Sequence, residues 1–210
     1  MASTLSSRNR EPLQPQREVG RRRVTDLKEA AAAVIQERGF EAATMAEIAA
    51  RADTRIGSLY RFFPSKEALA EALMQHYAEV LQAEYDVIRM RAADAAPEEL
   101  ADILIDLLVQ LYPQAGAVTA LLDSRTDSTE IRLRFRSQAL AGIKAALKTC
   151  APTLDDREAD DIAAVVLNNM KTMVGMTMKG APTSPGAPDE LRLMNRLYLA
   201  AKLGPGRPAA

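Results

Sequence analysis

Nine residues from Arg22 to Lys66 have the types and positions of candidate contacts with a nucleic acid. Arginine and serine side chains can hydrogen-bond to base edges, and glycine lets a backbone approach a ligand closely. Threonine, tyrosine and lysine are suited to holding backbone phosphates. We expect a base-reading group of Arg55, Gly57, Ser58 and Arg61, and a phosphate-contacting group of Thr44, Tyr60 and Lys66. Arg22 and Thr54 complete the set: Arg22 in a basic run that can reach phosphates or a minor groove, or stay solvated, and Thr54 as a helix cap.

Two short helices and a tight turn must position these residues. Thr44 stands three residues before Glu47, and this spacing is typical of a capping box at a helix start. Asp53 and Thr54 suit a turn, since both side chains bond readily to nearby backbone. Ile56, Leu59, Tyr60 and Phe63 then recur at helical spacing and predict a buried stripe, while Pro64 ends the helix and Ser65 can cap the next one. This order of elements predicts a helix-turn-helix between residues 44 and 66.

The same residues resemble the DNA-binding domain of the tetracycline-repressor (TetR) family of bacterial regulators. The resemblance rests on Thr44, Ile48-Ala49, Ala52, Gly57, Ser58-Leu59-Tyr60, Phe62-Phe63 and Pro64-Ser65-Lys66-Glu67-Ala68-Leu69. It implies an all-α fold of about nine helices, with an N-terminal three-helix helix-turn-helix domain and a C-terminal helical ligand-binding and dimerisation domain. The chain departs from the family pattern at Asp53-Thr54-Arg55, where family members usually have glycine, an apolar residue, and serine or threonine. The recognition helix is therefore expected to be capped from Thr54.

Composition agrees with a helical protein without enzymatic chemistry. The 210 residues are 48% hydrophobic but only 4% aromatic, and no region alternates with period two. The single Cys150 and single His76 supply neither a disulfide nor a metal site, so we expect no catalytic residues, no metal and no cofactor. No segment approaches the ~18 apolar residues of a membrane span. We therefore expect a cytoplasmic protein with no membrane partner.

Positive charge is concentrated toward the N-terminus. The net charge is −1, yet residues 1–66 carry twelve Lys or Arg against eight Asp or Glu, while the remainder carries fifteen against twenty. The predicted boundaries are a disordered arm over 1–20, the helix-turn-helix domain over 21–66, a helical domain over 67–203 and a disordered tail over 204–210. A helix from Lys66 to Arg91 is expected to join the two domains, and Pro113 is expected to end the next helix before a short one over 114–122.

The C-terminal part offers candidates for an effector site and a dimer interface. Methionine and tyrosine suit a loosely specific apolar pocket, although simple core packing explains each of these residues as well. The expected pocket residues are Met74, Tyr77, Leu81, Leu104, Leu108, Tyr112, Phe135, Asn169, Met170 and Met173. The last two helices are apolar over more than one face, which favours a partner subunit. The expected interface residues are Val166, Met173, Met176, Leu191, Met194, Leu197 and Tyr198.

These expectations together describe a homodimeric transcriptional repressor that leaves an inverted-repeat operator on double-stranded DNA when a small molecule binds. Two alternatives stay open. One is a helical ligand-binding or protein-interaction dimer whose helix-turn-helix reads no DNA. The other is a transcriptional activator, since no residue encodes the sign of regulation.

Overall fold

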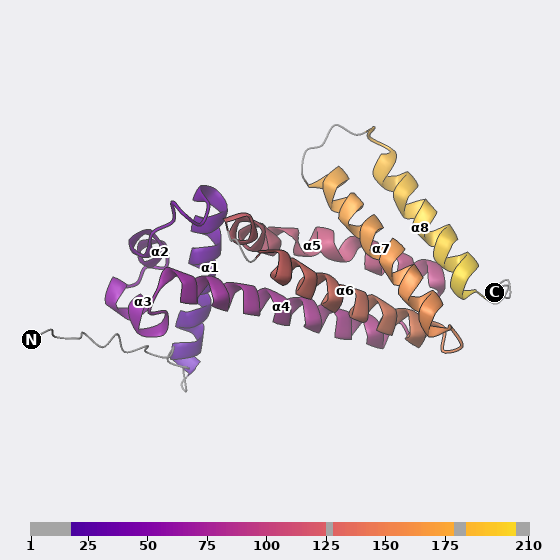
Figure 1. Ribbon diagram of the computed structural model, residues 1–210, viewed down its shortest axis with the longest axis horizontal. Helices are drawn as coiled ribbons and strands as arrows, with labels where there is room; N and C mark the ends of the chain where they lie inside the picture. The colour runs from indigo at the N-terminus through magenta and orange to yellow at the C-terminus, as the bar shows by residue number, and fades with distance from the viewer. Residues whose placement is uncertain (1–17, 125–127, 179–183, 205–210) are drawn as a thin grey trace, which may run out of the picture. The chain divides into compact units, whose positions relative to one another are not determined.

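The computed structural model describes residues 18–124, 128–178 and 184–204. Its described part contains eight helices and no strand (Figure 1), so the predicted all-α class is confirmed. The helices are α1 (Glu18–Arg38), α2 (Met45–Arg51), α3 (Ile56–Phe62), α4 (Lys66–Arg91), α5 (Pro97–Ser124), α6 (Ser128–Cys150), α7 (Asp156–Thr177) and α8 (Ala187–Leu203).

One helix boundary was predicted correctly in part. A bend at Pro113 separates two arms, Pro97–Pro113 and Ala115–Ser124, as expected, but both arms belong to the single helix α5. A proline removes one backbone donor and crowds the preceding turn, so a helix can kink and resume when its flanks are packed. Counting the two arms of α5 separately gives the nine helical segments expected from the sequence.

The chain divides into two compact units, and each contains more than one stretch of sequence. The first unit comprises Met1–His76 and Gly116–Arg125. Its helix-turn-helix pair, α2 and α3, follows α1 directly and leads into the start of α4 (Figure 1). Its core is built from the apolar stripe of α1 and the inner faces of the short helices: Leu27, Ala31, Val34, Ile35, Ile48, Leu59, Phe62 and Leu69.

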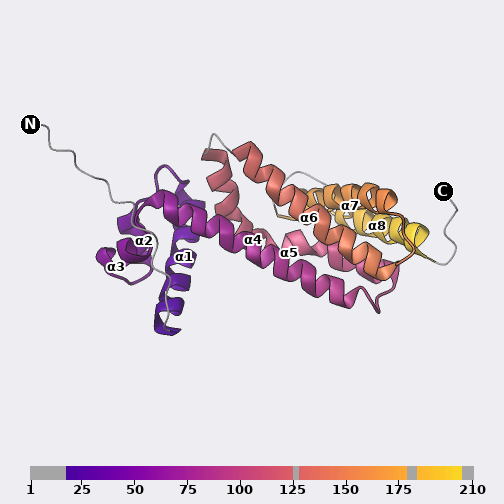
Figure 2. The ribbon, with the colours of Figure 1, turned by 60° about the horizontal axis from the view of Figure 1, so that its bottom comes forward.

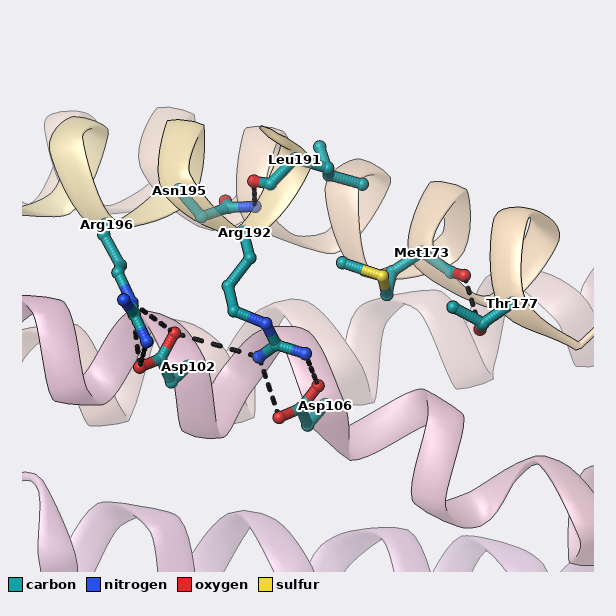
Figure 3. Close-up of polar contacts among 8 residues, drawn as sticks. All are labelled: Asp102, Asp106, Met173, Thr177, Leu191, Arg192, Asn195 and Arg196. Carbon is teal, nitrogen blue, oxygen red and sulfur yellow. Dashed lines mark hydrogen bonds and ion pairs between the residues drawn. The ribbon is translucent and has the colours of Figure 1, made fainter. Parts of the chain in front are cut away.

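The second unit comprises Tyr77–Ala115 and Thr126–Ala210. Figures 1 and 2 both draw α7 and α8 side by side, and α6 packs against α7. Bidentate ion pairs join α8 to α5, from Arg192 to Asp106 and from Arg196 to Asp102 (Figure 3). Between α7 and α8, the buried Asn195 accepts from the amide of Asn169 at 3.1 Å.

This division differs from the predicted boundaries. The first unit extends ten residues beyond Lys66 and also takes the second arm of α5, where a Cβ added to Gly116 would lie 2.7 Å from the side chain of Gln36. Residues 18–20 belong to α1 and not to the expected arm. Residues 1–17 and 205–210 lie outside the described part, so the expected disorder there is not addressed.

Among the described helices, none alone is long and apolar enough to cross a bilayer. Only the two arms of α5, taken together across the bend, pass that test by length and composition.

Candidate nucleic-acid interface

The start of α2 is fixed by local hydrogen bonds. The Thr44 hydroxyl accepts from the Glu47 amide at 3.2 Å, and the Glu47 carboxylate accepts from both the amide and the hydroxyl of Thr44, at 3.1 and 2.8 Å. These bonds hold the pKa of Glu47 below its ordinary value, because they favour the ionised carboxylate. The predicted capping box is confirmed. The Thr44 hydroxyl is therefore already bonded within α2 in the free protein.

The turn after α2 contains a strained residue. Asp53 has φ +46°, and the adjoining amides are satisfied by bonds from Asp53 N to Ala50 O and from Thr54 N to Ala49 O. This left-handed region is where the resembled family usually has glycine, and aspartate tolerates it better than most residues. The N-cap of α3 is Arg55, whose side chain makes no capping bond. The expected cap from Thr54 is therefore wrong.

The outward face of α3 includes two residues that the sequence pattern had placed in the buried stripe. Leu59 and Phe62 are buried, but Ile56 and Tyr60 keep 45% and 47% of their surface exposed. The predicted inward position of these two residues is wrong, because the helix turns Leu59 and Phe62 to the core and so carries Ile56 and Tyr60 to the outside. Beside them, Arg55, Gly57 and Arg61 are exposed and Ser58 is half-buried. The structure thus brings the four predicted base-reading residues onto one short helix.

Gly57 has no internal packing reason to lack a side chain. A Cβ built there meets no atom within 4 Å, and its φ is not in the left-handed region. Glycine inside a helix costs about 1 kcal/mol relative to alanine. Packing within the described residues does not account for this cost.

An open groove of about 530 Å³ lies between α3 and two helix starts. Its walls are Ala43, Thr44, Met45 and Ala46 at the start of α2, Ile56 and Tyr60 on α3, and Pro64, Ser65 and Lys66 at the start of α4. Backbone amides at helix starts carry partial positive charge and point toward an anion. The groove therefore suits a phosphate of a nucleic acid whose bases face α3.

Lys66 is bonded within the chain, so its predicted contact with phosphate stays a prediction. Its ammonium donates to the carbonyls of Phe40, Glu41 and Ala43 at 2.8, 3.1 and 3.2 Å, and it lies 4.5 Å from the centre of the Phe40 ring. An ammonium has three N–H donors, so these carbonyls use all of them. The sequence could not reveal this, because the carbonyls belong to a loop more than twenty residues away.

The cations of the first unit fall into paired and unpaired groups. Arg51 forms a bidentate pair with Glu37 at 2.8 and 2.6 Å, and Arg38 lies 3.4 Å from Glu47. Within the described residues, Arg22, Arg55 and Arg61 take part in no ion pair. Arg22 lies exposed on α1.

Most of the expected effector residues lie in or against one cluster of the second unit. Leu81, Leu104, Met170 and Met173 join one core cluster of the second unit, against which Leu108 and Phe135 pack, and Tyr77 meets Phe135 edge to face at 5.6 Å. Met74 belongs to the first unit, and Tyr112 is half-buried outside the cluster. Asn169 already has Asn195 as its partner, so the need for a ligand at this amide is removed.

The expected interface residues divide by exposure. Val166, Met173 and Leu191 are buried within the single chain and are therefore core, while Met176 and Tyr198 are half-buried. Met194 and Leu197 are exposed, as are Val165 and Leu193, which the sequence reasoning missed. The ion pairs of Arg192 and Arg196 indicate which side of α8 faces α5 (Figure 3). The exposed apolar residues are the remaining candidates for contact with a second subunit.

Comparisons with known proteins agree with this geometry. The family model described as "Bacterial regulatory proteins, tetR family" matches residues 27–73, which include α2 and α3. The HTH-type transcriptional repressor KstR of Mycolicibacterium smegmatis is 32% identical over 91 residues, 43% of this chain and 44% of that protein. KstR of Mycobacterium tuberculosis is 34% identical over 92 residues, 43% of this chain and 40% of its own. The chain thus matches less than half the length of these curated relatives.

Two solved structures have the same fold over most of both chains. A transcriptional regulator of Aquifex aeolicus gives a TM-score of 0.67 at 18% identity, covering 84% of this chain and 99% of its own. The regulator FadR of Bacillus subtilis, solved with stearoyl-CoA, gives 0.59 at 17% identity, with coverage of 86% and 97%. Residues 27–73 of the first unit, which hold the helix-turn-helix, thus match the tetR family of bacterial regulatory proteins, and the chain shares the fold of these two solved regulators.

Proposed function

We propose that this protein is a sequence-specific DNA-binding transcriptional regulator. The observation that carries the proposal is the outward face of α3, where Arg55, Gly57 and Arg61 lie exposed beside a groove with two helix starts in its wall. The groove receives a backbone phosphate and α3 reads base edges in the major groove. Ile56 and Tyr60 add apolar contact to sugars or to thymine methyl groups.

Fluorescence polarisation against genomic fragments tests this proposal. We expect salt-dependent binding to a small subset of fragments. Arg55→Ala should weaken the preferred site by about tenfold to a hundredfold and change the ranking of fragments, because a lost base contact costs ~1–3 kcal/mol. Arg91→Ala, at an exposed arginine on the last turn of α4 in the second unit, is the matched control. Micromolar binding of the wild type that ignores sequence at physiological salt would contradict the proposal.

The regulator acts as a homodimer in this proposal. Its support is the exposed apolar set Val165, Leu193, Met194 and Leu197 on α7 and α8. Two-fold pairing through these helices presents two copies of α3 to an inverted repeat with half-sites ~34 Å apart. Leu197→Glu should give monomers in analytical ultracentrifugation, since Leu197 is 63% exposed and its loss leaves the core intact. Leu133→Glu, at a 57% exposed position on α6, should remain dimeric; monomers from both variants or neither would contradict this assignment.

A small-molecule effector releases the repressor from its operator. Support comes from α4 and α5, because each contributes residues to both units and can transmit a change in one to the other. Binding in the second unit favours a tilt of α4, which at 26 residues is ~39 Å long, and so changes the separation of the two α3 helices. FadR of Bacillus subtilis has this fold and was solved with stearoyl-CoA, which makes acyl-CoA thioesters the first effectors to test.

Spin labels measure the tilt directly. After Cys150→Ala removes the native thiol, a label at residue 58 reports the distance between the two α3 helices of a dimer. The distance should change when a compound that lowers operator affinity is added, and an unchanged distance would refute the mechanism. A reporter gene measured with and without the regulator decides between repressor and activator. A dimer that binds ligand but prefers no DNA sequence would support the other alternative, a helical dimer whose helix-turn-helix reads no DNA.

A further inference from the structure

A tyrosine hydroxyl is sealed inside the second unit without a protein partner. Tyr85, on α4, keeps only 2% of its surface exposed, and no described residue lies within hydrogen-bond distance of its Oη atom. Buried polar side-chain atoms nearly always have a partner, so an exception needs an explanation. Phenylalanine would fill the same space without burying an oxygen.

The ring of Tyr85 is held in place by the backbone of α6. A Cβ added to Gly142 would lie 2.4 Å from the ring Cγ and 2.7 Å from both Cδ atoms, so the ring lies directly on Gly142. Leu81 and Ile88, one turn before and after Tyr85 on α4, are buried, as is Ile143 beside Gly142. The ring therefore cannot swing its hydroxyl to solvent without unpacking α4 from α6.

The surroundings restrict the chemistry of any molecule that reaches this hydroxyl. Among the described residues, no charged side chain is fully buried, and Tyr77 is the one group whose electrostatic effect on Tyr85 is resolved. Burial, and secondarily Tyr77, raise the pKa of Tyr85 well above its ordinary value, so the hydroxyl stays protonated and can donate. An isolated carboxylate would be costly here because nothing in the cluster compensates its charge. An uncharged acceptor such as a carbonyl oxygen carries a much smaller penalty.

We propose that Tyr85 Oη donates a hydrogen bond to the carbonyl group of a largely apolar, uncharged effector segment, such as a ketone, ester or thioester. The proposal rests on the effector-responsive function above and names the chemistry of its binding site. The ligand enters the cluster that Leu81, Met170 and Met173 share with Tyr85. Methionine side chains adapt to an added molecule because they are unbranched and polarisable.

Acetophenone and ethylbenzene form a matched probe pair, since they have similar size and differ by the carbonyl oxygen. Calorimetric titration of the wild type should show acetophenone binding about fivefold to tenfold more tightly than ethylbenzene, the factor expected for one hydrogen bond. Tyr85→Phe should bind both equally. Tyr198→Phe removes the same atom from a half-buried tyrosine on α8 that packs against the same cluster, and it should keep the preference.

Infrared spectroscopy gives a readout that altered packing would not reproduce. The stretch of carbonyl-labelled ¹³C-acetophenone should lie at lower wavenumber when bound to the wild type than when bound to Tyr85→Phe. Equal binding of the two probes by the wild type, no binding of acetophenone, or a preference that survives in Tyr85→Phe would overturn the proposal. If Tyr85→Phe does not fold, an unshifted stretch in the wild type still overturns it.

The result of the DNA-binding experiment is independent of the result of this ligand-binding experiment. A chain that selects an operator but shows no carbonyl preference contradicts only the Tyr85 site. A chain that prefers the ketone but binds DNA without selectivity contradicts the proposed regulator and leaves the site in place.

Discussion

The two helices of the helix-turn-helix have equal length but begin in opposite ways. Both α2 and α3 contain seven residues. The N-cap of α2 is Thr44 with a complete capping box, whereas the N-cap of α3 is Arg55 with no side-chain bond. Local bonds therefore fix where α2 begins, while α3 depends on a strained turn and on burial of Leu59 and Phe62. The start of α2 is thus determined by its own residues. The position of α3, the helix proposed to read DNA, is determined by the preceding turn and by packing against the rest of the first unit.

The largest effect is expected at Lys66, whose ammonium donates to three carbonyls of residues 40–43. These bonds are a second support for the start of α2. Lys66→Met should lower the free energy of unfolding by about 2–3 kcal/mol, because it leaves three carbonyls without a charged donor. Urea denaturation measures the change, with Arg23→Met as the control on an exposed arginine of α1. If Lys66→Met is as stable as Arg23→Met but binds all DNA sequences more weakly by the same factor, Lys66 contacts phosphate as predicted. Its bonds to the carbonyls then contribute little to stability.

The next test removes the local support of α2. Thr44→Ala should cost about 1–2 kcal/mol of unfolding free energy, the usual price of a lost N-cap. Thr54→Ala, at the threonine that was expected to cap α3, should cost much less because it makes no capping bond. Equal costs at the two positions would remove the contrast between the helices.

The contribution of Thr44 depends on pH through Glu47. Since Thr44 lowers the pKa of Glu47 below its ordinary value of 4.5, this stabilisation is present above that value. It is lost as the pH falls through the lowered pKa. The difference between wild type and Thr44→Ala should therefore narrow in acid; a difference that does not change with pH would show that Glu47 is not involved.

A smaller effect of opposite sign is expected in the turn. Asp53→Gly should stabilise the first unit by about 0.5–1 kcal/mol, because φ +46° is unstrained for glycine. Ala52→Gly, one residue earlier at φ −83°, should instead destabilise it. Thermal unfolding followed by circular dichroism compares the two variants, and the same sign for both would mean that the turn stores no strain.

The smallest effect comes from giving α3 the cap it lacks. Arg55→Ser should stabilise α3 by a few tenths of a kcal/mol up to about 1 kcal/mol and slow amide exchange in its first turn. Operator affinity should fall at the same time, because Arg55 belongs to the base-reading group. Slower amide exchange with unchanged operator affinity would show that Arg55, at the start of α3, does not contribute to DNA binding.

The contrast also explains which features could be predicted from the sequence. The start of α2 was predictable because Thr44 and Glu47 are three residues apart and need nothing else. The position of Ile56 was not, since the side of α3 that faces inward depends on how Leu59 and Phe62 are buried in the core of the first unit. The bonds of Lys66, the pairing of Asn169 with Asn195 and the burial of Val166 are likewise long-range, and no local pattern encodes them.

The discontinuous first unit limits how this regulator can be recombined with others. Its described core includes Gly116–Ser124, which follow the Pro113 bend, and Gly116 is the residue against which Gln36 rests. A chimera cut after α4 would leave this segment with the donor of the second unit and give α1 a foreign neighbour. Exchange of the second unit therefore requires grafting Gly116–Ser124 together with the N-terminal helices, as two pieces of one part.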